Sequence, residues 1–425
     1  MAGPKPHVSK NIQGLRPSAT VAINERSNAL KEAGRDIIKF GLGQSPFPVP
    51  DVVVRALQTN AHQKDYLPVK GLRQLRDAVA EFHRQRDGVE GRTGDDVVIG
   101  PGSKELLFLV QLVYGADLLI PSPAWVSYAP QAQLLGRPCH HIETDPHDGW
   151  RLSPERLDAL CVQQGPRPRI LILNYPCNPT GLTLHPDRLR ELAAVAREHE
   201  IVVLSDEIYG EINHEGSHTS IARFYPEGTI LSAGLSKWCG AGGWRLGTFL
   251  FPPDMRWLAD AVGIAASETY TSVSAPIQHA AITAYTPSQE IEDYLDRSRR
   301  ILKALGTWSA STLRRAGAHC PDPEGGFYLL ADFSRLSSRL RERGFNDPAT
   351  LCESMLEDTG VAVLPGTDFG RSATELSIRL AYVDFNGEHA LNAATHDAVL
   401  DEEWMRSHCP RVVTGIERIS SWVSA

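Results

Sequence analysis

The sequence contains little that marks a disulfide scaffold or a metal centre. Its 425 residues include seven cysteines, an odd number, which are scattered and form no C-x-x-C pair. This pattern is typical of reduced thiols in the cytoplasm and not of a disulfide framework or a zinc site. The 15 histidines also lack metal-ligand spacing. We therefore expect no metal.

The sequence also lacks a long apolar run and a basic region. The longest apolar stretch, residues 106–121, is broken by Gln111, Gly115 and Asp117, so it is too short to cross a bilayer. The first residues have no apolar signal-peptide core. A net charge of −8, spread along the chain, argues against a nucleic-acid groove. We expect a cytoplasmic protein that binds neither membranes nor nucleic acids.

Strand-like and helical patterns alternate between about residues 95 and 250. A length of 425 residues is long for one core and suits two domains. The order strand, helix, strand predicts an α/β fold, with a large domain whose mostly parallel sheet is flanked by helices. The continuous apolar run 170–173 is typical of a strand buried on both faces. The other expected strands are 97–99, 118–120 (ended by Pro121), 201–204 and 229–231, and the helices cover 104–113 and begin at Pro154 and Pro186.

The last third of the sequence has a different pattern. A helical stretch near 290–313 leaves the large domain, and strand-like runs follow at 325–330, 360–366 and 376–382. These features predict a smaller α+β domain. The first 50 residues are proline-rich and not helix-periodic, and we expect them to pack on it; residues 414–425 are a helix or a tail. The predicted division is a segment 1–50, a large cofactor-binding domain 51–300 and a small domain 301–425.

One lysine lies in a glycine-rich run that could hold a cofactor. Lys237 is one of only nine lysines, and Arg245 follows it after a turn that contains Gly240, Gly242 and Gly243. Such a run can hold a carbonyl cofactor as an imine on the lysine and bring the guanidinium to a phosphate. A surface loop with a structural arginine is the alternative.

Polar side chains follow several of the predicted strands. Asn178, in the turn Asn-Pro-Thr-Gly, can point its amide at a ligand, although these are also ordinary turn residues. Asp206 follows the next strand. A buried carboxylate is costly unless paired, and a pyridinium nitrogen would be a partner for it; a helix N-cap is the alternative. Tyr209, three residues on, can donate to a phenolate oxygen on the same ring.

Two further segments are weaker candidates. Gly102, Ser103 and Lys104 lie at the start of an expected helix, where free N–H groups favour a phosphate, but they form neither a P-loop nor a dinucleotide motif. Trp125 could stack on a flat ring, although a lone tryptophan more often only packs. Ligands of parallel sheets bind beyond the carboxyl ends of the strands, which is where these segments fall.

Together, these segments resemble the class I/II aminotransferases, which are fold type I pyridoxal-phosphate enzymes. The resemblance is carried by 178–181, by Asp206-x-x-Tyr209, and by Ser236-Lys237 with Arg245, and it extends from about residue 40 to 382. It implies pyridoxal 5'-phosphate as cofactor. It also implies transfer of an amino group between an amino acid and a 2-oxo acid through an aldimine on Lys237.

The resemblance implies a role for each matching residue. Lys237 would form the internal aldimine and move the proton between Cα and C4′, and Asp206 would pair with the pyridine nitrogen. Asn178 and Tyr209 would bind the phenolate oxygen, and Trp125 would stack on the ring. The phosphate would be held by Gly102, Ser103, Lys104 and Arg245.

The resemblance also implies how substrate and partner subunit are bound. Arg379 would clamp the α-carboxylate, which a guanidinium meets with two hydrogen bonds, and the backbone of Gly43 would approach the same group. Tyr66 would reach the phosphate of the neighbouring subunit, which implies a homodimer. Two departures from the family pattern affect this picture: Gly234 replaces a frequent serine, and the segment 44–47 differs where relatives border the substrate.

Two other functions stay open at this point. Relatives with the same cofactor residues carry out eliminations, γ-replacements or ring closures after the same deprotonation, as the aminocyclopropane-carboxylate synthases do on S-adenosylmethionine. Some transcription factors carry this fold behind a DNA-binding helix-turn-helix. The charge of −8 and the proline-rich start of the chain argue against this last reading.

Overall fold

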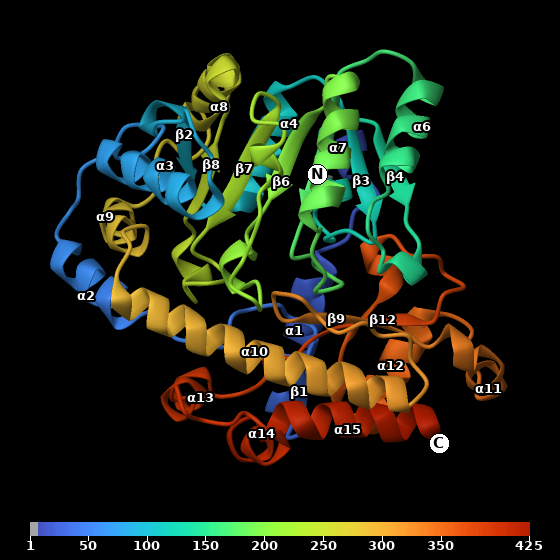
Figure 1. The fold of residues 1–425 in the computed structure, drawn as a ribbon. Helices are drawn as coiled ribbons and strands as arrows, with labels where there is room; N and C mark the ends of the chain where they lie inside the picture. Colours follow the sequence, from blue (N-terminus) through green and yellow to red (C-terminus); the bar gives the residue numbers. More distant parts are fainter. Residues whose placement is uncertain (1–6) are drawn as a thin grey trace, which may run out of the picture.

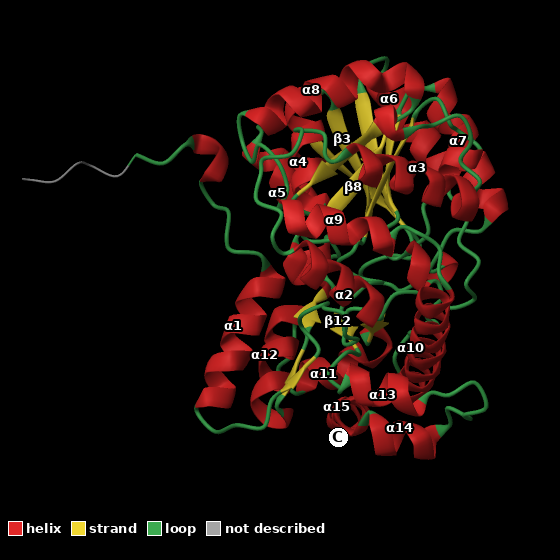
Figure 2. Cartoon of the chain, turned by 90° about the vertical axis from the view of Figure 1, so that its left-hand side faces the viewer, coloured by secondary structure: helices red, strands yellow, loops and turns green. Residues whose placement is uncertain are grey.

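The computed structural model describes residues 7–425, which form two bodies joined side by side. The upper body in Figure 1 contains a seven-stranded sheet between helices, and the lower body contains two small sheets surrounded by helices. Figure 2 shows the same division from the side. Residues 1–6 of the predicted N-terminal segment lie outside the described part of the chain. The predicted α/β fold is confirmed.

The large sheet has a single strand direction apart from one member. Of its seven described strands, β8 alone runs antiparallel to its neighbours. The start of β8 therefore lies at the edge where the parallel strands end. In spatial order the strands are β2 (Val97–Gly100), β8 (Gly247–Leu250), β7 (Thr229–Gly234), β6 (Val202–Asp206), β5 (Arg169–Asn174), β3 (Asp117–Ser122) and β4 (Cys139–Glu143).

Both faces of this sheet are covered by apolar cores. In β5, Ile170 and Ile172 belong to the core beneath α4, α5 and α8, whereas Leu171 and Leu173 belong to the core beneath α6 and α7. Successive side chains of a strand point to opposite faces, so a continuous apolar run is needed here. The helices are α4 (Ser103–Val113), α5 (Tyr128–Leu134), α6 (Pro154–Gln164), α7 (Pro186–Glu198) and α8 (Arg256–Ser267).

A long helix connects the two bodies. α10 (Gln289–Arg315) begins where the Ser288 side chain accepts a hydrogen bond from the Ile291 amide, as an N-cap. At this end Glu290 accepts from the amide of Val52, the second residue of α2. Further along, α10 packs on α15 of the lower body. The remaining helices around the β2 end are α2 (Asp51–Asn60), α3 (Arg73–Asp87) and α9 (Ala275–Ala284).

The lower body is built from short strands and terminal helices. β9 (Tyr328–Asp332), β12 (Ser377–Ala381) and β11 (Leu364–Pro365) form an antiparallel sheet, and β1 (Ile38–Lys39) pairs in parallel with β10 (Val361–Ala362). The predicted domain boundaries at residues 50 and 300 stay a prediction. The helix α10 continues through residue 300 without a break, so no change of element marks that position. The helices are α1 (Ala19–Glu32), α11 (Ser337–Glu342), α12 (Pro348–Thr359), α13 (Gly387–Ala393), α14 (Glu402–His408) and α15 (Pro410–Ser424).

The N-terminal segment is more regular than the sequence suggested. The prediction of an irregular start is wrong, because residues 19–32 form α1. In this helix only Ser27 is buried; Ile23 and Leu30 are partly buried against the small cluster of Ile37, Leu356 and Ala362. A helix with so little apolar surface has no clear periodicity in its sequence. The helix alternative for residues 414–425 is confirmed by α15.

Two predicted strands have different ends in the structure. β3 continues past Pro121, which pairs with Ile142 of β4. The pairing of β3 with β5 ends at Leu119. Proline is tolerated at position 121 because no backbone N–H is needed there for a hydrogen bond to β5. Residues 360–366 do not form one strand: Val361–Ala362 and Leu364–Pro365 belong to different sheets.

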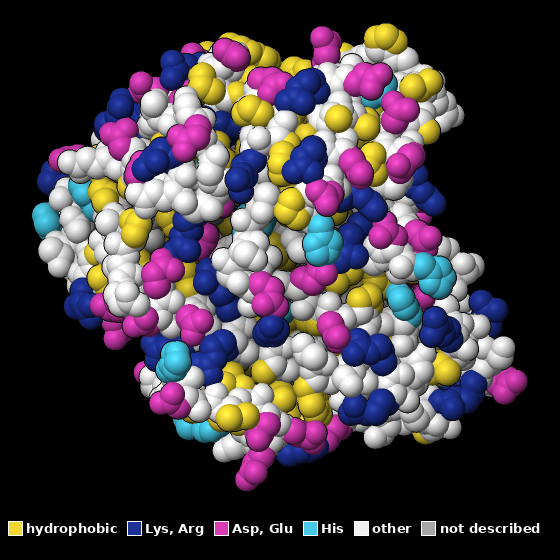
Figure 3. All heavy atoms as spheres, in the orientation of Figure 1, with side chains coloured by type: hydrophobic (Ala, Val, Ile, Leu, Met, Phe, Trp, Pro, Cys, Tyr) yellow, Lys and Arg dark blue, Asp and Glu magenta, His cyan; other side chains and the backbone are white. Residues whose placement is uncertain are grey.

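The surface offers no segregated charge on the face that Figure 3 shows, where acidic and basic side chains alternate over both bodies. Within residues 7–425, no helix combines the length and the apolar character that a membrane crossing requires.

We predict that Gly247→Ala destabilises the protein. A Cβ on Gly247 would overlap the backbone of Gly102 and Ser103 at the start of α4, and overpacking of this kind costs roughly 1–3 kcal/mol. Urea unfolding should show the loss. The control is Gly263→Ala in α8, where the new Cβ would meet Lys70 Cε at an ordinary 3.5 Å. That change should be neutral or stabilising by up to about 1 kcal/mol. Equal stability of both variants would contradict the close approach.

Candidate active site

A cavity of about 350 Å³ opens at the edge where the parallel strands of the large sheet end. Its wall includes side chains from the loops after these strands and from the lower body. Ten of the twelve predicted site residues line it: Gly43, Ser103, Lys104, Trp125, Asn178, Asp206, Tyr209, Lys237, Arg245 and Arg379. Gly102 lies directly behind Arg245, and Tyr66 lies elsewhere.

Lys237 follows β7 and projects into the buried part of this cavity. Its Nζ donates a hydrogen bond to the Gly43 carbonyl at 2.7 Å and lies 5.6 Å from the centroid of the Tyr209 ring. Burial, followed by the charge of Arg379, lowers the pKa of Lys237 to about 8. A neutral amine, which can act as a nucleophile or a base, is therefore accessible close to neutral pH.

Asp206 is the last residue of β6, and its carboxylate is buried. Tyr128 donates to Oδ2 at 2.6 Å, and Ser232 donates to Oδ1 at 3.3 Å. Burial raises the pKa of Asp206 to about 6, although the hydrogen bond from Tyr128 lowers it. Burial makes the charged form of this carboxylate costly, so it would be stabilised by a cationic partner. The N–H of a protonated pyridine ring is a partner of that kind, so this residue fits pyridoxal phosphate.

Asn174 holds the two neighbouring loops together. Its Nδ2 donates to the Asp206 carbonyl and its Oδ1 accepts from the Asn178 amide, each at 2.8 Å. These bonds bring Asn178 beside Asp206. On the other side, the hydroxyls of Tyr209 and Tyr328 are 2.9 Å apart. The side chains of Asn178 and Tyr209 both line the cavity, as the interpretation of a shared phenolate partner requires.

The start of α4 forms a corner whose groups suit an anion. Gly102 is the N-cap residue, has a φ of 93° and supplies no side-chain cap, so the first amides of the helix stay available. A Cβ on Gly102 would overlap the guanidinium of Arg245. This guanidinium donates to the carbonyls of Gly242 and Pro101 at 3.0 and 3.3 Å. Free amides next to a guanidinium suit a phosphate.

A second group suited to an anion is the guanidinium of Arg379 in β12. The residue is fully buried, and its Nη2 donates to the Gly41 carbonyl at 2.9 Å. Its Nε and Nη1 have no hydrogen-bond partner among residues 7–425. Close by, a Cβ on Gly43 would overlap the Tyr328 hydroxyl. A buried guanidinium with two unused donors fits a carboxylate.

The ring of Trp125, the residue predicted to stack on the cofactor, is in contact with the amine of Lys104. Lys104 Nζ lies 4.9 Å from the centroid of the Trp125 ring, and Tyr128 packs edge-on against the same ring at 5.3 Å. Tyr128 thus contacts both Trp125 and Asp206.

The sequence did not reveal three of the residues that shape the cavity. Tyr128 lies three residues after Trp125, a spacing that places both on one side of a helical turn and could have indicated it. Asn174 directly follows the predicted strand 170–173 and ends β5, and Tyr328 comes from the lower body; neither was predicted as a site residue. The other residues of the wall are Thr20, Val21, Leu42, Gln44, Ile208, Ser236, Gly242 and Gly243.

Besides Gly102, two residues singled out in the sequence lie outside the wall. Tyr66 is 91% exposed, and its role at a neighbouring subunit stays a prediction. Gly234 pairs with Gly247, and a Cβ on it would lie 2.8 Å from the Leu246 carbonyl oxygen. A serine at this position would need a shift of the backbone, which is a physical reason for the departure from the family pattern.

The fold and the site together define a pyridoxal-phosphate enzyme of fold type I. A buried lysine, a buried carboxylate and a helix start with free amides meet at one sheet edge. The sequence model described as "Aminotransferase class I and II" matches residues 35–393. The chain belongs to this family, and it is an aminotransferase with pyridoxal 5'-phosphate as cofactor.

Individual relatives agree with this assignment. The chain is 31% identical over 380 residues to the aspartate/prephenate aminotransferase of Thermus thermophilus, covering 88% of this chain and 94% of the relative. It is 31% identical over 387 residues to the aspartate aminotransferase of Bacillus subtilis, with coverage of 88% and 94%. The structure of the Thermus thermophilus aspartate aminotransferase with maleate is similar with a TM-score of 0.84 at 29% identity, covering 98% of this chain and all of that one.

We predict that Asp206→Asn changes how the stability of the cofactor-free protein depends on pH. Because burial raises the folded-state pKa of Asp206 from 3.8 to about 6, its stabilising contribution is present below about pH 4 and is lost as the pH rises through about 6. Urea unfolding should show wild type losing on the order of 3 kcal/mol relative to Asp206→Asn between about pH 4 and about pH 7. The control is Asp187→Asn, which removes an exposed carboxylate. Parallel curves for wild type and Asp206→Asn would contradict the shift.

Proposed function

We propose that the cavity binds pyridoxal phosphate through the residues the sequence indicated. Lys237 would carry the cofactor, Asp206 its ring nitrogen, and Asn178 with Tyr209 its phenolate oxygen. When bound, the cofactor withdraws electrons from the Cα of an attached amino acid. Trp125 would cover the ring. The phosphate would lie among Gly102, Ser103, Lys104 and Arg245.

In this proposal the chain's own residues place the substrate and move one proton. Arg379 holds the α-carboxylate, with the Gly43 backbone beside it, and so fixes the orientation of the Cα–H bond. Lys237 Nζ, whose pKa burial lowers to about 8, takes the proton from Cα. The single observation that carries the proposal is the buried Arg379 guanidinium, with two donors that have no partner in the described chain, in the same cavity as Lys237.

The reaction of the holoenzyme with an amino donor alone distinguishes transamination from elimination, replacement and ring closure. Holoenzyme mixed with an amino donor, without an acceptor, should release one 2-oxo acid per site and convert the cofactor to its amine form. Elimination, replacement or ring closure after the same deprotonation would instead turn over repeatedly without an acceptor. Repeated release of product would therefore overturn transamination as the main reaction.

We propose an acidic amino acid such as aspartate as the first donor to test. Both relatives above are named for aspartate.

We predict that Arg379→Ala discriminates between aspartate and β-alanine, which is aspartate without its α-carboxylate. For aspartate, kcat/KM should fall by an amount equivalent to about 2–5 kcal/mol, because a buried charged hydrogen bond is lost. For β-alanine the change should be much smaller. Steady-state kinetics of both donors check this, with Arg379→Lys as the conservative control, which should lose less for aspartate. An equal loss for both donors would place the carboxylate clamp elsewhere.

We also propose that the active form is a homodimer in which Tyr66 reaches the partner's phosphate. The support is that Tyr66 is exposed and does not line the cavity of its own chain, together with the family to which the chain belongs. The proposed division into residues 1–50, 51–300 and 301–425 accords with the pairing of β1 with β10. A cytoplasmic location accords with seven free cysteines.

We predict that two inactive variants restore each other. Tyr66→Arg and Lys237→Ala, exchanged into mixed dimers, should give one site with both lesions and one site with neither. Activity should return toward about half of the wild-type value per mixed dimer, since one intact site remains. Native mass spectrometry confirms that mixed dimers have formed. Mixed dimers without activity would show that Tyr66 does not act across the interface.

A further inference from the structure

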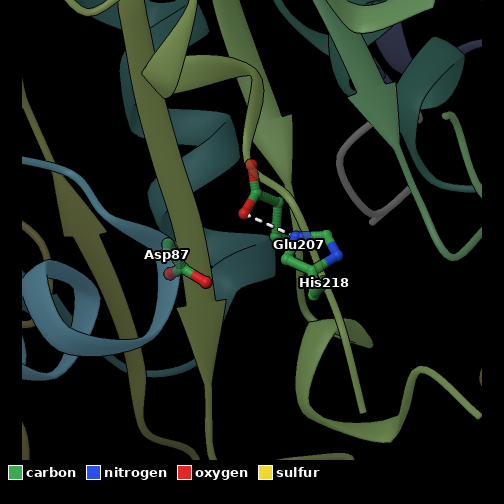
Figure 4. A group of neighbouring side chains, drawn as sticks. All are labelled: Asp87, Glu207 and His218. Atoms are coloured by element: carbon green, nitrogen blue, oxygen red, sulfur yellow. Dashed lines mark hydrogen bonds and ion pairs between the residues drawn. The ribbon is translucent and has the colours of Figure 1, made fainter. Parts of the chain in front are cut away.

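A buried cluster of ionisable side chains lies behind the cofactor cavity. Asp206 lines the cavity, whereas the next residue, Glu207, lines a separate pocket of about 20 Å³. Figure 4 shows Glu207 with His218 and Asp87; their ligand atoms lie within 4.8 Å of one another. Each of these three side chains is less than a tenth exposed. The cluster needs a physical account, because buried charges are costly unless paired.

The Glu207 carboxylate is saturated with donors. Its Oε1 accepts from Ser205 Oγ at 2.6 Å, Tyr175 OH at 3.0 Å and Ser220 Oγ at 2.7 Å. Its Oε2 accepts from His218 Nε2 at 2.8 Å. These donors come from β6, from the loop after β5 and from the segment 218–221. One carboxylate therefore ties three segments of the chain together.

The same segments present the proposed cofactor contacts. Asp206 precedes Glu207 in the chain and Tyr209 follows it by two residues. Tyr175 follows Asn174, whose amide bonds to both Asp206 and Asn178. Any relaxation of the Glu207 carboxylate would displace the groups around the cofactor ring.

The charge of Glu207 is offset by His218. Burial alone would lower the pKa of His218, but Glu207 beside it, and then Asp87 and Glu211, raise it above its usual value. Burial likewise acts to raise the pKa of Glu207, and His218 lowers it below its usual value. The 2.8 Å contact and the opposite directions of these shifts favour an imidazolium–carboxylate pair, in which His218 Nδ1 has no hydrogen-bond partner among residues 7–425.

The remaining charges around the pair have partners of their own. His83 Nδ1 lies 2.6 Å from an Asp87 oxygen. Arg86 lies 3.1 Å and Arg299 3.6 Å from Glu211. Asp87 and Glu211 therefore each have a cationic or hydrogen-bonding partner. For Glu207, a proton on His218 would supply the positive charge that a metal ion would otherwise bring.

We propose that Glu207 and His218 are positioning residues: their buried ion pair holds Asp206, Asn178 and Tyr209 in place for pyridoxal phosphate. The inference rests on the proposed function of the cavity. It adds a layer of residues that do not touch the cofactor.

Glu207→Gln tests the proposal, since it keeps the size of the side chain and removes the charge. The control is Asp158→Asn, which neutralises a carboxylate of α6 that His199, just after α7, contacts at 2.6 Å; Asp158 lines neither the cavity nor the pocket of the cluster. Cofactor-free protein is titrated with pyridoxal phosphate, and the holoenzyme is assayed with aspartate. Glu207→Gln should raise the Kd of the cofactor about tenfold and lower kcat roughly ten- to a hundredfold, as misplacement of reacting groups does. The KM for aspartate should change less than about twofold, because Arg379 lies outside this network.

The outcomes separate the two claims. A folded Glu207→Gln protein with the Kd and kcat of wild type would overturn the positioning role. Wild type that fails to bind pyridoxal phosphate would overturn the proposed function instead. Asp158→Asn should match wild type in both quantities.

His218→Gln provides a second test that needs no cofactor. Because the folded-state pKa of His218 is raised, its stabilising contribution is present below its unfolded pKa and is lost as the pH rises through the folded value. Urea unfolding should therefore show a larger gap between wild type and His218→Gln at about pH 6 than at about pH 9. A gap independent of pH would overturn the ion pair. A rise in the Tm of wild type on adding Zn²⁺ that Glu207→Gln abolishes would also overturn it, by showing that the donors hold a metal ion.

Discussion

The chemistry proposed for the cavity depends on the burial of two ionisable groups, Lys237 and Asp206, away from water. Burial lowers the pKa of Lys237 to about 8 and raises that of Asp206 to about 6. The same physical cause therefore moves an amine and a carboxylate in opposite directions, toward their neutral forms. The amine becomes available for bonding to a carbonyl, and the carboxylate becomes a strong partner for a pyridinium N–H.

The fold brings the other groups to this point by strand direction. Parallel strands place Ser103, Asn178, Asp206 and Lys237 at one edge. Arg245 joins them because β8 runs the opposite way, so its start lies at that edge. The lower body adds Arg379. In the proposed function, the cofactor phosphate and the substrate α-carboxylate would thus be held by different bodies, which would set the direction of the substrate across the ring.

Much of this could be predicted from the sequence, because the strands carry strong local signals and the motif residues follow them directly. The apolar run 170–173 is an example, and the wall of the cavity contains ten of the predicted residues. α1 was missed because it has little apolar surface. Tyr128 could have been indicated only by its spacing from Trp125. Tyr328 and the Glu207–His218 pair could not be predicted, since their roles arise from contacts that no local sequence pattern indicates. The role of Tyr66 at the phosphate of the partner subunit stays a prediction, because the structure contains one chain and no subunit interface.

The central claim is that Lys237 is the residue to which the cofactor is bonded. The most direct measurement is borohydride reduction of the holoenzyme, followed by digestion and mass mapping of the lysine that carries the cofactor. The account predicts the modification on the peptide that contains Lys237. Modification of Lys104, the other lysine of the cavity wall, with Lys237 unmodified would contradict it.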